Sequence, residues 1–396
     1  MLHPRLVTSH LQALSRRFPS ISILGPRQIG KSTLARLAFP RYVLLDLEDP
    51  IALDRLQADP LLVLQENRHL VIDEAQRMPT LFPVLRSFLD RHPDRRIILL
   101  GSASPKLVQG ISESLTGRVA FLELGGISIL EEEPGQLWLK GGFPRLHWSR
   151  PRARPEEWFP AYLRTSLEQD LPQLGFAISA SRLRAVMTMV AHAQGSTANL
   201  SELGSSLGIS YHSVAHLLDL LEGVFLIRRL PPYFANIRKR LVKSPKLYVR
   251  DTGLLHSLLG VAFQRSALLR HPKAGASFET FCIEQIIEHA RLGNPGAEAF
   301  FFRTHTGIEI DLLLSIRSKL IPIEVKLGLG VPNLSGLERG MRELKLSRGY
   351  VVYAGTGRTQ LRRGIWMCGL RELLEELDLI PGAKRSRRSI RLVAAR

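Results

Sequence analysis

Residues 25 to 32 read Gly25-Pro26-Arg27-Gln28-Ile29-Gly30-Lys31-Ser32, and the apolar run Ile21 to Leu24 comes directly before them. The spacing is G-x-x-x-x-G-K-[ST], the pattern of a phosphate-binding loop between a strand and a helix. Gly25 and Gly30 allow backbone angles that aim successive N–H groups into one concavity. A polyphosphate fits such a concavity, so we expect a nucleoside triphosphate site here.

The end of the loop carries the expected chemistry. We predict that Lys31 reaches the β- and γ-phosphates of ATP and that Ser32 places its hydroxyl on Mg²⁺. Thr33 is expected to lie beside them, and the helix that begins near Lys31 adds its positive N-terminal end. The alternative is a glycine-containing turn between a strand and a helix that binds nothing.

A second apolar run, residues 69 to 72, ends in two carboxylates, Asp73 and Glu74. This arrangement is typical of the Walker B strand of a nucleotide-hydrolysing enzyme. We expect Asp73 to hold the hydration shell of Mg²⁺, and Glu74 to orient or deprotonate the attacking water. An acidic pair of this kind can also be a solvated strand end, but here it accompanies the loop.

Two further residues are candidates for the same site. Ser102 follows a third buried strand, residues 97 to 100, and lies where doubly wound folds bind ligands, so it could sense the γ-phosphate or the water. Capping of a helix by Ser102 or Ser104 is the alternative. Arg118 could act as an arginine finger on the nucleotide of a neighbouring subunit in a ring or dimer, or could be an ordinary surface residue. The predicted nucleotide-binding residues are Gly25, Pro26, Arg27, Gln28, Ile29, Gly30, Lys31, Ser32, Thr33 and Ser102.

The composition is that of a globular protein with several domains. The chain has 396 residues, 45% of them hydrophobic and 23% charged, which leaves room for two to four domains. No run approaches the length of a membrane span, and the N-terminus lacks a signal-peptide pattern. Cys282 and Cys368 cannot build a disulfide framework or a zinc site by themselves. We therefore expect a cytoplasmic protein without a membrane partner.

The formal net charge of +18 is concentrated in two segments. Leu226 to Arg250 holds basic residues and no acidic ones, and residues 381–396 form a second such segment. Concentrated positive charge suits a polyanion, so DNA is the predicted partner. The alternative is a solvated basic face followed by a disordered tail, with ribosome or membrane adhesion as further options.

The order of apolar segments predicts an α/β fold in several domains. Strands near 21–24, 42–46, 70–73, 97–100 and 119–124 alternate with helical stretches, which predicts a parallel sheet flanked by helices. The stretch 141–155 is expected to be a loop or hinge, and residues 157–194 a helical lid interrupted near Pro172 and Gly175. The predicted domains are 1–155, a P-loop ATPase core; 156–262, a helical lid and winged helix; 263–380, an α/β nuclease-like domain; and 381–396, a basic disordered tail.

A helix-turn-helix pattern lies within the second domain. Leucines at helical spacing mark a first helix near 200–207, Ser210 is placed to cap a second, and residues 224–230 and 246–250 could form the strands of a wing. Tyr211, His212 and Ser213 would then face a groove of DNA. Because the second helix has no Lys or Arg between Tyr211 and Glu222, both DNA contact and protein interaction stay open.

The last domain contains a second candidate centre. Glu279 lies on a predicted helix, Asp311 on a predicted strand at 307–314, and Glu324 and Lys326 on another at 321–326. If these strands pair, Asp311 and Glu324 become neighbours that could share a divalent cation, with Lys326 positioning water or stabilising negative charge. Cross-strand salt bridges on an exposed sheet face are the alternative. A helix at 334–344 and a strand at 350–354 would complete a βαβ unit.

With these motifs the chain resembles a widespread family of bacterial and archaeal AAA-type ATPases that carry a C-terminal domain of uncharacterised function. The resemblance covers nearly the whole length and includes Gly101-Ser102, Gly117-Arg118, Gly141-Gly142-Phe143-Pro144 and residues 241–254. The C-terminal region is similar to the PD-(D/E)xK nuclease-like superfamily through Glu279, Asp311, Glu324 and Lys326, although Ile310 replaces the proline before Asp311. The resemblance implies an AAA-type ATPase followed by a winged helix and a restriction-endonuclease-like fold.

Two hypotheses follow. In the first, an Mg²⁺-dependent ATPase acts on DNA through its basic, nuclease-like C-terminal half. In the second, the protein is a nucleotide-driven switch or scaffold in regulation or defence, and its nuclease-like domain only binds a partner.

Overall fold

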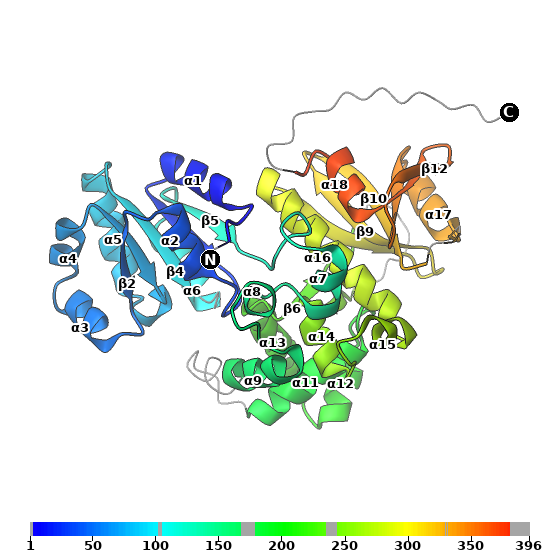
Figure 1. Cartoon of the computed structure of the whole chain (residues 1–396), viewed down its shortest axis with the longest axis horizontal. Coiled ribbons are helices and arrows are strands. Elements are labelled where there is room, and N and C mark those ends of the chain that lie inside the picture. Colours follow the sequence, from blue (N-terminus) through cyan, green and yellow to red (C-terminus); the bar gives the residue numbers. More distant parts are fainter. Residues whose placement is uncertain are drawn as a thin grey trace. The chain divides into compact units, whose positions relative to one another are not determined.

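The computed structural model describes residues 3–101, 105–167, 179–234, 244–328, 330 and 332–380, without the side chains of 105–108 (Figure 1). The chain divides into two compact units, Met1–Pro232 with Lys243–Phe281, and Tyr233–Val242 with Cys282–Arg396. No described helix combines the length and apolarity that a membrane span needs. Ser102, the interruption near Pro172 and Gly175, and the tail 381–396 lie outside the described residues.

The first unit begins with a five-stranded sheet in the order β2-β3-β4-β1-β5, and every neighbouring pair is parallel. The central strands are buried along almost their whole length, as expected for apolar runs covered on both faces. The predicted parallel sheet is therefore confirmed. Its strands are β1 (Ser20–Leu24), β2 (Val43–Asp46), β3 (His69–Asp73), β4 (Arg96–Gly101) and β5 (Val119–Glu123).

Two groups of helices cover this sheet (Figure 1). The first two helices of the chain pack against each other. The next four helices, from residue 50 to residue 114, each pack against the following one. They cover a cluster of buried hydrophobic residues that includes Leu64, Phe82 and Leu99. A short 3-10 turn, η1 (Ala75–Arg77), follows β3 and contacts β4. The helices are α1 (Thr8–Arg17), α2 (Lys31–Ala38), α3 (Pro50–Ala58), α4 (Pro60–Glu66), α5 (Leu81–Arg91) and α6 (Pro105–Ser114).

The rest of the first unit is mainly helical. Gly208 ends one helix with a left-handed backbone (φ 62), and the Ser210 side chain caps the next one through Ser213 N at 3.1 Å, as the sequence predicted. An antiparallel hairpin follows, β6 (Ile227–Leu230) with β7 (Lys246–Val249). Its identity as a winged helix stays a prediction. The helices are α7 (Pro134–Lys140), α8 (Pro144–His147), α9 (Pro155–Thr165), α11 (Ala180–His192), α12 (Leu200–Leu207), α13 (Tyr211–Gly223), α14 (Thr252–Leu258), α15 (Arg265–Arg270) and the start of α16 (Ala274–Gly293).

The second unit is built on a six-stranded mixed sheet in the order β12-β13-β11-β10-β9-β8. The strands β10 and β11 are parallel, and helix α17 (Ser335–Glu343) connects them, so the predicted βαβ unit is present. Met341 and Phe302 belong to the core between this helix and the sheet. The remaining elements are β8 (Glu298–Arg303), β9 (Glu309–Ile316), β10 (Lys319–Lys326), β11 (Gly349–Tyr353), β12 (Arg358–Arg362), β13 (Ile365–Cys368) and α18 (Leu370–Glu376).

Candidate nucleotide site

The loop at residues 25 to 32 joins the end of β1 to the start of α2. Gly30 has a left-handed backbone (φ 97), which only glycine adopts without strain. A Cβ atom on Gly25 would lie 2.5 Å from the carbonyl oxygen of Leu124, just after β5, so this position has no room for a side chain. Gly30 thus has the special backbone angle that the sequence predicted, whereas Gly25 has no positive φ and is required because a side chain would not fit.

Lys31 is buried although it carries a charge, with 6% of its surface exposed. Its Nζ atom donates to the carbonyl oxygens of Gly25 at 3.0 Å and Pro26 at 3.1 Å, so the ammonium group lies inside the curve of its own loop. Phosphate oxygens are stronger acceptors than these carbonyls because they are charged. The side chain is thus held where an incoming triphosphate would meet it.

Ser32 and Asp73 bring two oxygen ligands together. The Ser32 hydroxyl donates to Oδ2 of Asp73 at 2.5 Å, and the backbone N–H of Glu74 donates to Oδ1 of the same carboxylate at 3.0 Å. Mg²⁺ prefers hard oxygen ligands and is commonly held by one or two carboxylates together with substrate phosphates. Among the described residues, no three His, Cys, Asp or Glu side chains gather into a cage for a metal ion. The Ser32 hydroxyl and the Asp73 carboxylate therefore fit an Mg²⁺ ion.

Glu74 lies one residue beyond the end of β3 and has a left-handed backbone, with φ 52 and ψ 44. Burial raises the pKa of its carboxyl above the ordinary value, while the ammonium of Lys31 acts in the opposite direction. The amide of Gln76 donates to its Oε2 atom. The structure thus places this carboxylate in the same site as Lys31 and Asp73, at the carboxyl edge of the sheet.

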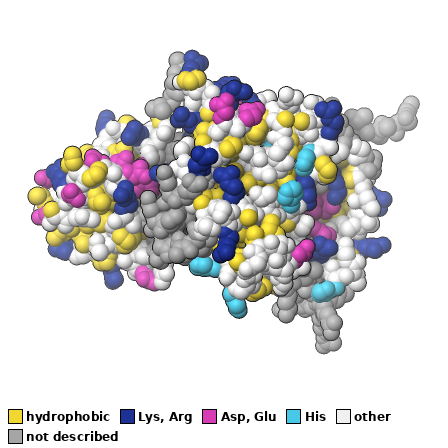
Figure 2. All heavy atoms as spheres, turned by 90° about the horizontal axis from the view of Figure 1, so that it is seen from below, with side chains coloured by type: hydrophobic (Ala, Val, Ile, Leu, Met, Phe, Trp, Pro, Cys, Tyr) yellow, Lys and Arg dark blue, Asp and Glu magenta, His cyan; other side chains and the backbone are white. Residues whose placement is uncertain are grey.

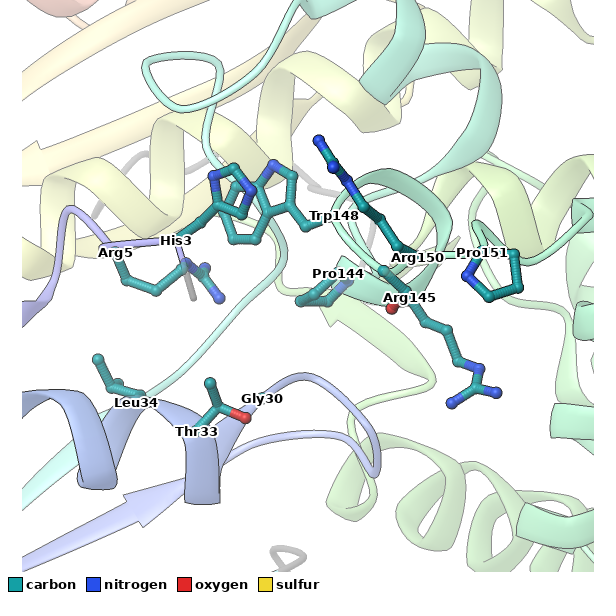
Figure 3. Close-up of a pocket in the computed structure, with 11 residues that line it drawn as sticks. His3, Arg5, Gly30, Thr33, Leu34, Pro144, Arg145, Trp148, Arg150 and Pro151 are labelled. Carbon is teal, nitrogen blue, oxygen red and sulfur yellow. The ribbon is translucent and has the colours of Figure 1, made fainter. Parts of the chain in front are cut away.

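A cavity of about 540 Å³ lies against the loop. Figure 3 shows Gly30, Thr33 and Leu34 on one side of it and Pro144 and Trp148 on the other. The rings of His3 and Trp148 stack with centroids 4.9 Å apart. Sequence reasoning missed this cavity. The break at Gly141-Gly142-Phe143-Pro144 was its one signal, because α8 begins there and presents Pro144 to the loop.

Basic side chains also line the cavity. Arg5 is nearly buried and pairs with Glu131 at 3.3 Å, while its Nη2 atom donates to the carbonyl oxygen of Gly126 at 2.6 Å. Arg145 and Arg150 are exposed, and within the described part of the chain neither side chain forms an ion pair. The cavity next to the loop therefore combines aromatic rings with positive charge, the two features that a nucleotide contacts.

Arg118 lies at the opposite edge of the sheet from the loop. Its carbonyl oxygen accepts from the N–H of Ser20, the first residue of β1, whereas the loop follows the last residue of that strand. Its guanidinium group pairs with Asp90 at 2.5 Å. Arg118 therefore cannot serve the nucleotide of its own subunit in this arrangement, and its role in trans stays a prediction.

The second candidate centre is partly assembled. Leu312 on β9 pairs with Ile323 on β10, which sets Asp311 opposite Glu324. Both carboxylates are buried, Asp311 Oδ2 accepts from Val325 N at 2.9 Å, and Lys326 Nζ lies 2.7 Å from Glu324 Oε1. These three predicted residues do lie together in the second unit.

Glu279 belongs to the first unit and has its own partners there. Its Oε1 atom accepts from the hydroxyl of Tyr248 at 2.6 Å and lies 3.4 Å from Nζ of Lys246. Lys246 and Tyr248 are both buried on β7. The predicted metal ligand is thus part of a buried polar network that ties the first turns of α16 to the hairpin.

The basic segment 226–250 is only partly available to a polyanion. Arg228 and Arg250 both pair with Glu123 at the end of β5, at 3.8 and 2.6 Å, and Arg229 pairs with Asp219 at 2.7 Å. Together with Lys246, every described cation of this segment has an acidic partner. On the face in Figure 2, the described Lys and Arg side chains are spread among apolar and uncharged ones. Arg238, Lys239, Arg240 and Lys243 lie outside the described residues.

Three family models match consecutive parts of the chain. Residues 17–132 match an AAA domain, residues 131–265 a domain of unknown function (DUF8612), and residues 274–373 another domain of unknown function (DUF4143). The uncharacterized proteins Rv2008c of Mycobacterium tuberculosis and Mb2031c of Mycobacterium bovis are each 40% identical over 370 residues, which cover 91% of this chain and 82% of each relative.

Solved structures show weaker similarity. The Walker-type ATPase PABY2304 of Pyrococcus abyssi is 16% identical to this chain, with a TM-score of 0.45. The similarity covers 65% of this chain and 99% of the PABY2304 chain. The signal transduction ATPase with numerous domains PH0952 of Pyrococcus horikoshii is 13% identical over 72% of this chain and 48% of its own, with a TM-score of 0.24.

Proposed function

We propose that this chain, which belongs to the family of the mycobacterial proteins Rv2008c and Mb2031c, binds ATP with Mg²⁺ and hydrolyses it. The AAA match over residues 17–132 identifies that part as a P-loop ATPase domain of the AAA type, as the sequence predicted. The observation that carries the proposal is the contact of 2.5 Å between Ser32 and Asp73. It joins the phosphate-binding loop to the Walker B strand.

Each residue of the site would have a distinct role in binding ATP or in its hydrolysis. The loop N–H groups and Lys31 bind the β- and γ-phosphates, and Ser32 and Asp73 hold Mg²⁺. When bound, Mg²⁺ would neutralise the negative charge that develops on the phosphates. Glu74 accepts a proton from a water molecule while the oxygen of that water attacks the γ-phosphorus. The bond between the γ-phosphorus and the oxygen that bridges it to the β-phosphate breaks, and ADP leaves.

We place the base and ribose of ATP in the cavity next to the loop. Thr33 and Leu34 line it directly after the phosphate-binding residues, so a nucleotide whose phosphates sit in the loop extends into it. Trp148 offers an aromatic face on which a base can stack. Arg145 and Arg150 also line the cavity and are exposed, and their positive charge suits the phosphates of the ligand.

The test is phosphate release by the full-length protein with ATP and MgCl₂. Lys31→Ala should lose both ATP binding and turnover, whereas Glu74→Gln should still bind ATP but turn it over at least about a hundredfold more slowly. Lys319→Ala is the matched control, because this lysine is exposed on β10 in the second unit. An active Glu74→Gln variant would remove Glu74 from the reaction, and an inactive wild type would overturn the proposal.

ATP binding and hydrolysis could serve either of two functions. Action on DNA is supported by the net charge of +18 and the basic tail. A nucleotide-driven switch, with the C-terminal domain as a binding module that does not cleave, is favoured by the ion pairs that occupy Arg228, Arg229, Lys246 and Arg250. Between the two, the occupied cations make us favour the switch.

One experiment separates these two candidates. The protein is incubated with single-stranded, duplex and branched DNA, with and without ATP and Mg²⁺, and both DNA cleavage and phosphate release are followed. For the switch we expect intact DNA, ATP turnover that DNA does not change, and an oligomeric state that responds to ATP. Cleavage that Asp311→Ala and Lys326→Ala abolish would instead establish a nuclease.

A further inference from the structure

Gln76 lies in η1, the short turn that follows the Walker B strand, and it contacts one residue of the proposed reaction. Its side-chain amide donates a hydrogen bond to Oε2 of Glu74. Gln76 is half-buried, and Ala75 between the two residues is fully buried, so this turn is fixed to the domain core. The main chain of the turn therefore holds the Gln76 side chain beside the Glu74 carboxylate, to which its amide donates.

The backbone of Glu74 is held in an unfavourable conformation. A left-handed backbone is unfavourable for a residue with a side chain, and it persists only where the surroundings enforce it. Here the carbonyl oxygen of Glu74 accepts from Arg77 N at 2.9 Å, and its N–H donates to Oδ1 of Asp73 at 3.0 Å. The main chain of Glu74 is thus fixed on both sides.

A fixed backbone leaves the side-chain torsions of Glu74 as the remaining freedom. The hydrogen bond from Gln76 restrains them, because it gives Oε2 a fixed partner. A catalytic carboxylate needs this restraint, since an ångström of misplacement can cost about a hundredfold in rate.

We propose that Gln76 is a positioning residue for ATP hydrolysis, whose amide orients the Glu74 carboxylate to receive the proton of the attacking water. The inference rests on the proposed function and deepens it, because it names a residue that acts through Glu74 and does not itself touch the nucleotide. It predicts that the donor atom of residue 76 matters, and not its bulk.

Gln76→Met tests this directly, since methionine keeps the length and shape of the side chain and removes the donor. We expect kcat for ATP to fall about tenfold to a hundredfold, with KM and the Kd for ATP changed by less than about twofold. The thermal midpoint should stay that of the wild type. The matched control is Gln57→Met on the exposed face of α3, which should leave all four quantities unchanged.

A double-mutant cycle separates positioning from general support of the fold. If Gln76 acts through Glu74, adding Gln76→Met to Glu74→Gln should produce no further loss of turnover, because the carboxylate that it orients is already gone. Losses that multiply would overturn the proposal, and so would a Gln76→Met variant within about twofold of wild-type kcat. A wild type that does not hydrolyse ATP would overturn both this inference and the proposed function, whereas an active wild type with an unaffected variant overturns only the inference.

Discussion

The Oγ atom of Ser32 lies 2.5 Å from Oδ2 of Asp73, although β4 separates the strands that lead to these two residues. Ser32 is in the first turn of α2 and Asp73 is the last residue of β3. The contact therefore spans the end of β4 at the carboxyl edge of the sheet. It joins two motifs that the sequence offers separately, and it places an alcohol and a carboxylate where one cation can bind both.

Asp73→Asn should abolish Mg²⁺-dependent turnover while leaving the fold intact. The amide keeps the shape of the side chain but loses the negative charge that attracts the cation, so we expect at least about a hundredfold less phosphate release at saturating ATP. A titration of phosphate release with MgCl₂ measures this. Asp94→Asn, at an exposed position after α5, is the control. Full activity of Asp73→Asn would mean that another residue holds the ion.

Two variants can distinguish a role of Arg118 on a neighbouring subunit from its ion pair with Asp90. If it acts on the nucleotide of a neighbouring copy, Arg118→Ala should lower kcat by at least about a hundredfold, spare ATP binding, and leave a rate that no longer rises with protein concentration. Asp90→Asn breaks the same ion pair and keeps the guanidinium group, so it should retain activity. Equal behaviour of the two variants would assign Arg118 to the surface ion pair alone.

Glu279 should prove to be a stabilising residue of the first unit. Glu279→Gln removes the negative charge that faces the buried ammonium of Lys246, and breaking a buried pair from one side typically costs about 3 kcal/mol. We expect a lower urea midpoint, which Lys246→Met in the same chain should partly restore. Glu298→Gln at an exposed position of β8 is the control. An unchanged midpoint would reopen the metal-ligand interpretation.

The nucleotide site could be predicted from the sequence because its chemistry is local. Gly25 to Ser32 are consecutive, Asp73 and Glu74 are neighbours, and each motif ends a strand whose apolar run is visible in the sequence. The pairing of Asp311 with Glu324 could also be predicted from the sequence. Their strands are joined by a tight turn with positive φ at Arg317 (49) and Ser318 (64), and such a turn sets the register of a hairpin.

The partners of the basic residues could not be predicted in this way. Glu123 and Arg250 meet only because the hairpin packs against the end of β5, and a run of cations in a sequence does not show which of them will be buried against acids. Glu279 is a similar case, because helix and strand periodicity places it on a face without saying what covers that face. The cavity beside Trp148 depends on α8 reaching the loop, a contact between segments that no local pattern encodes.

Stability of the first unit should depend on pH through His256. This residue is 1% exposed; its Nδ1 atom is 2.9 Å from the carbonyl oxygen of Leu139, and its Nε2 is 2.7 Å from the hydroxyl of Ser277. Because a carbonyl can only accept, Nδ1 carries the proton and Nε2 accepts from Ser277. Burial lowers the pKa of His256 from 6.5 to about 4.

The sign of the effect follows from these two values. Between pH 6.5 and 4, His256 binds a proton in the unfolded state but stays neutral in the folded state. The contribution of His256 to the free energy of unfolding is therefore fully present above pH 6.5 and is lost as the pH falls. The loss should reach about 2 kcal/mol by pH 5. Urea midpoints from tryptophan fluorescence at pH 7.5 and pH 5 measure it. His256→Gln should be less stable at pH 7.5 but show a smaller decrease between the two pH values, whereas His305→Gln, at an exposed position, should decrease as the wild type does. An equal decrease in His256→Gln would show that other groups, such as the buried His147, cause the pH dependence.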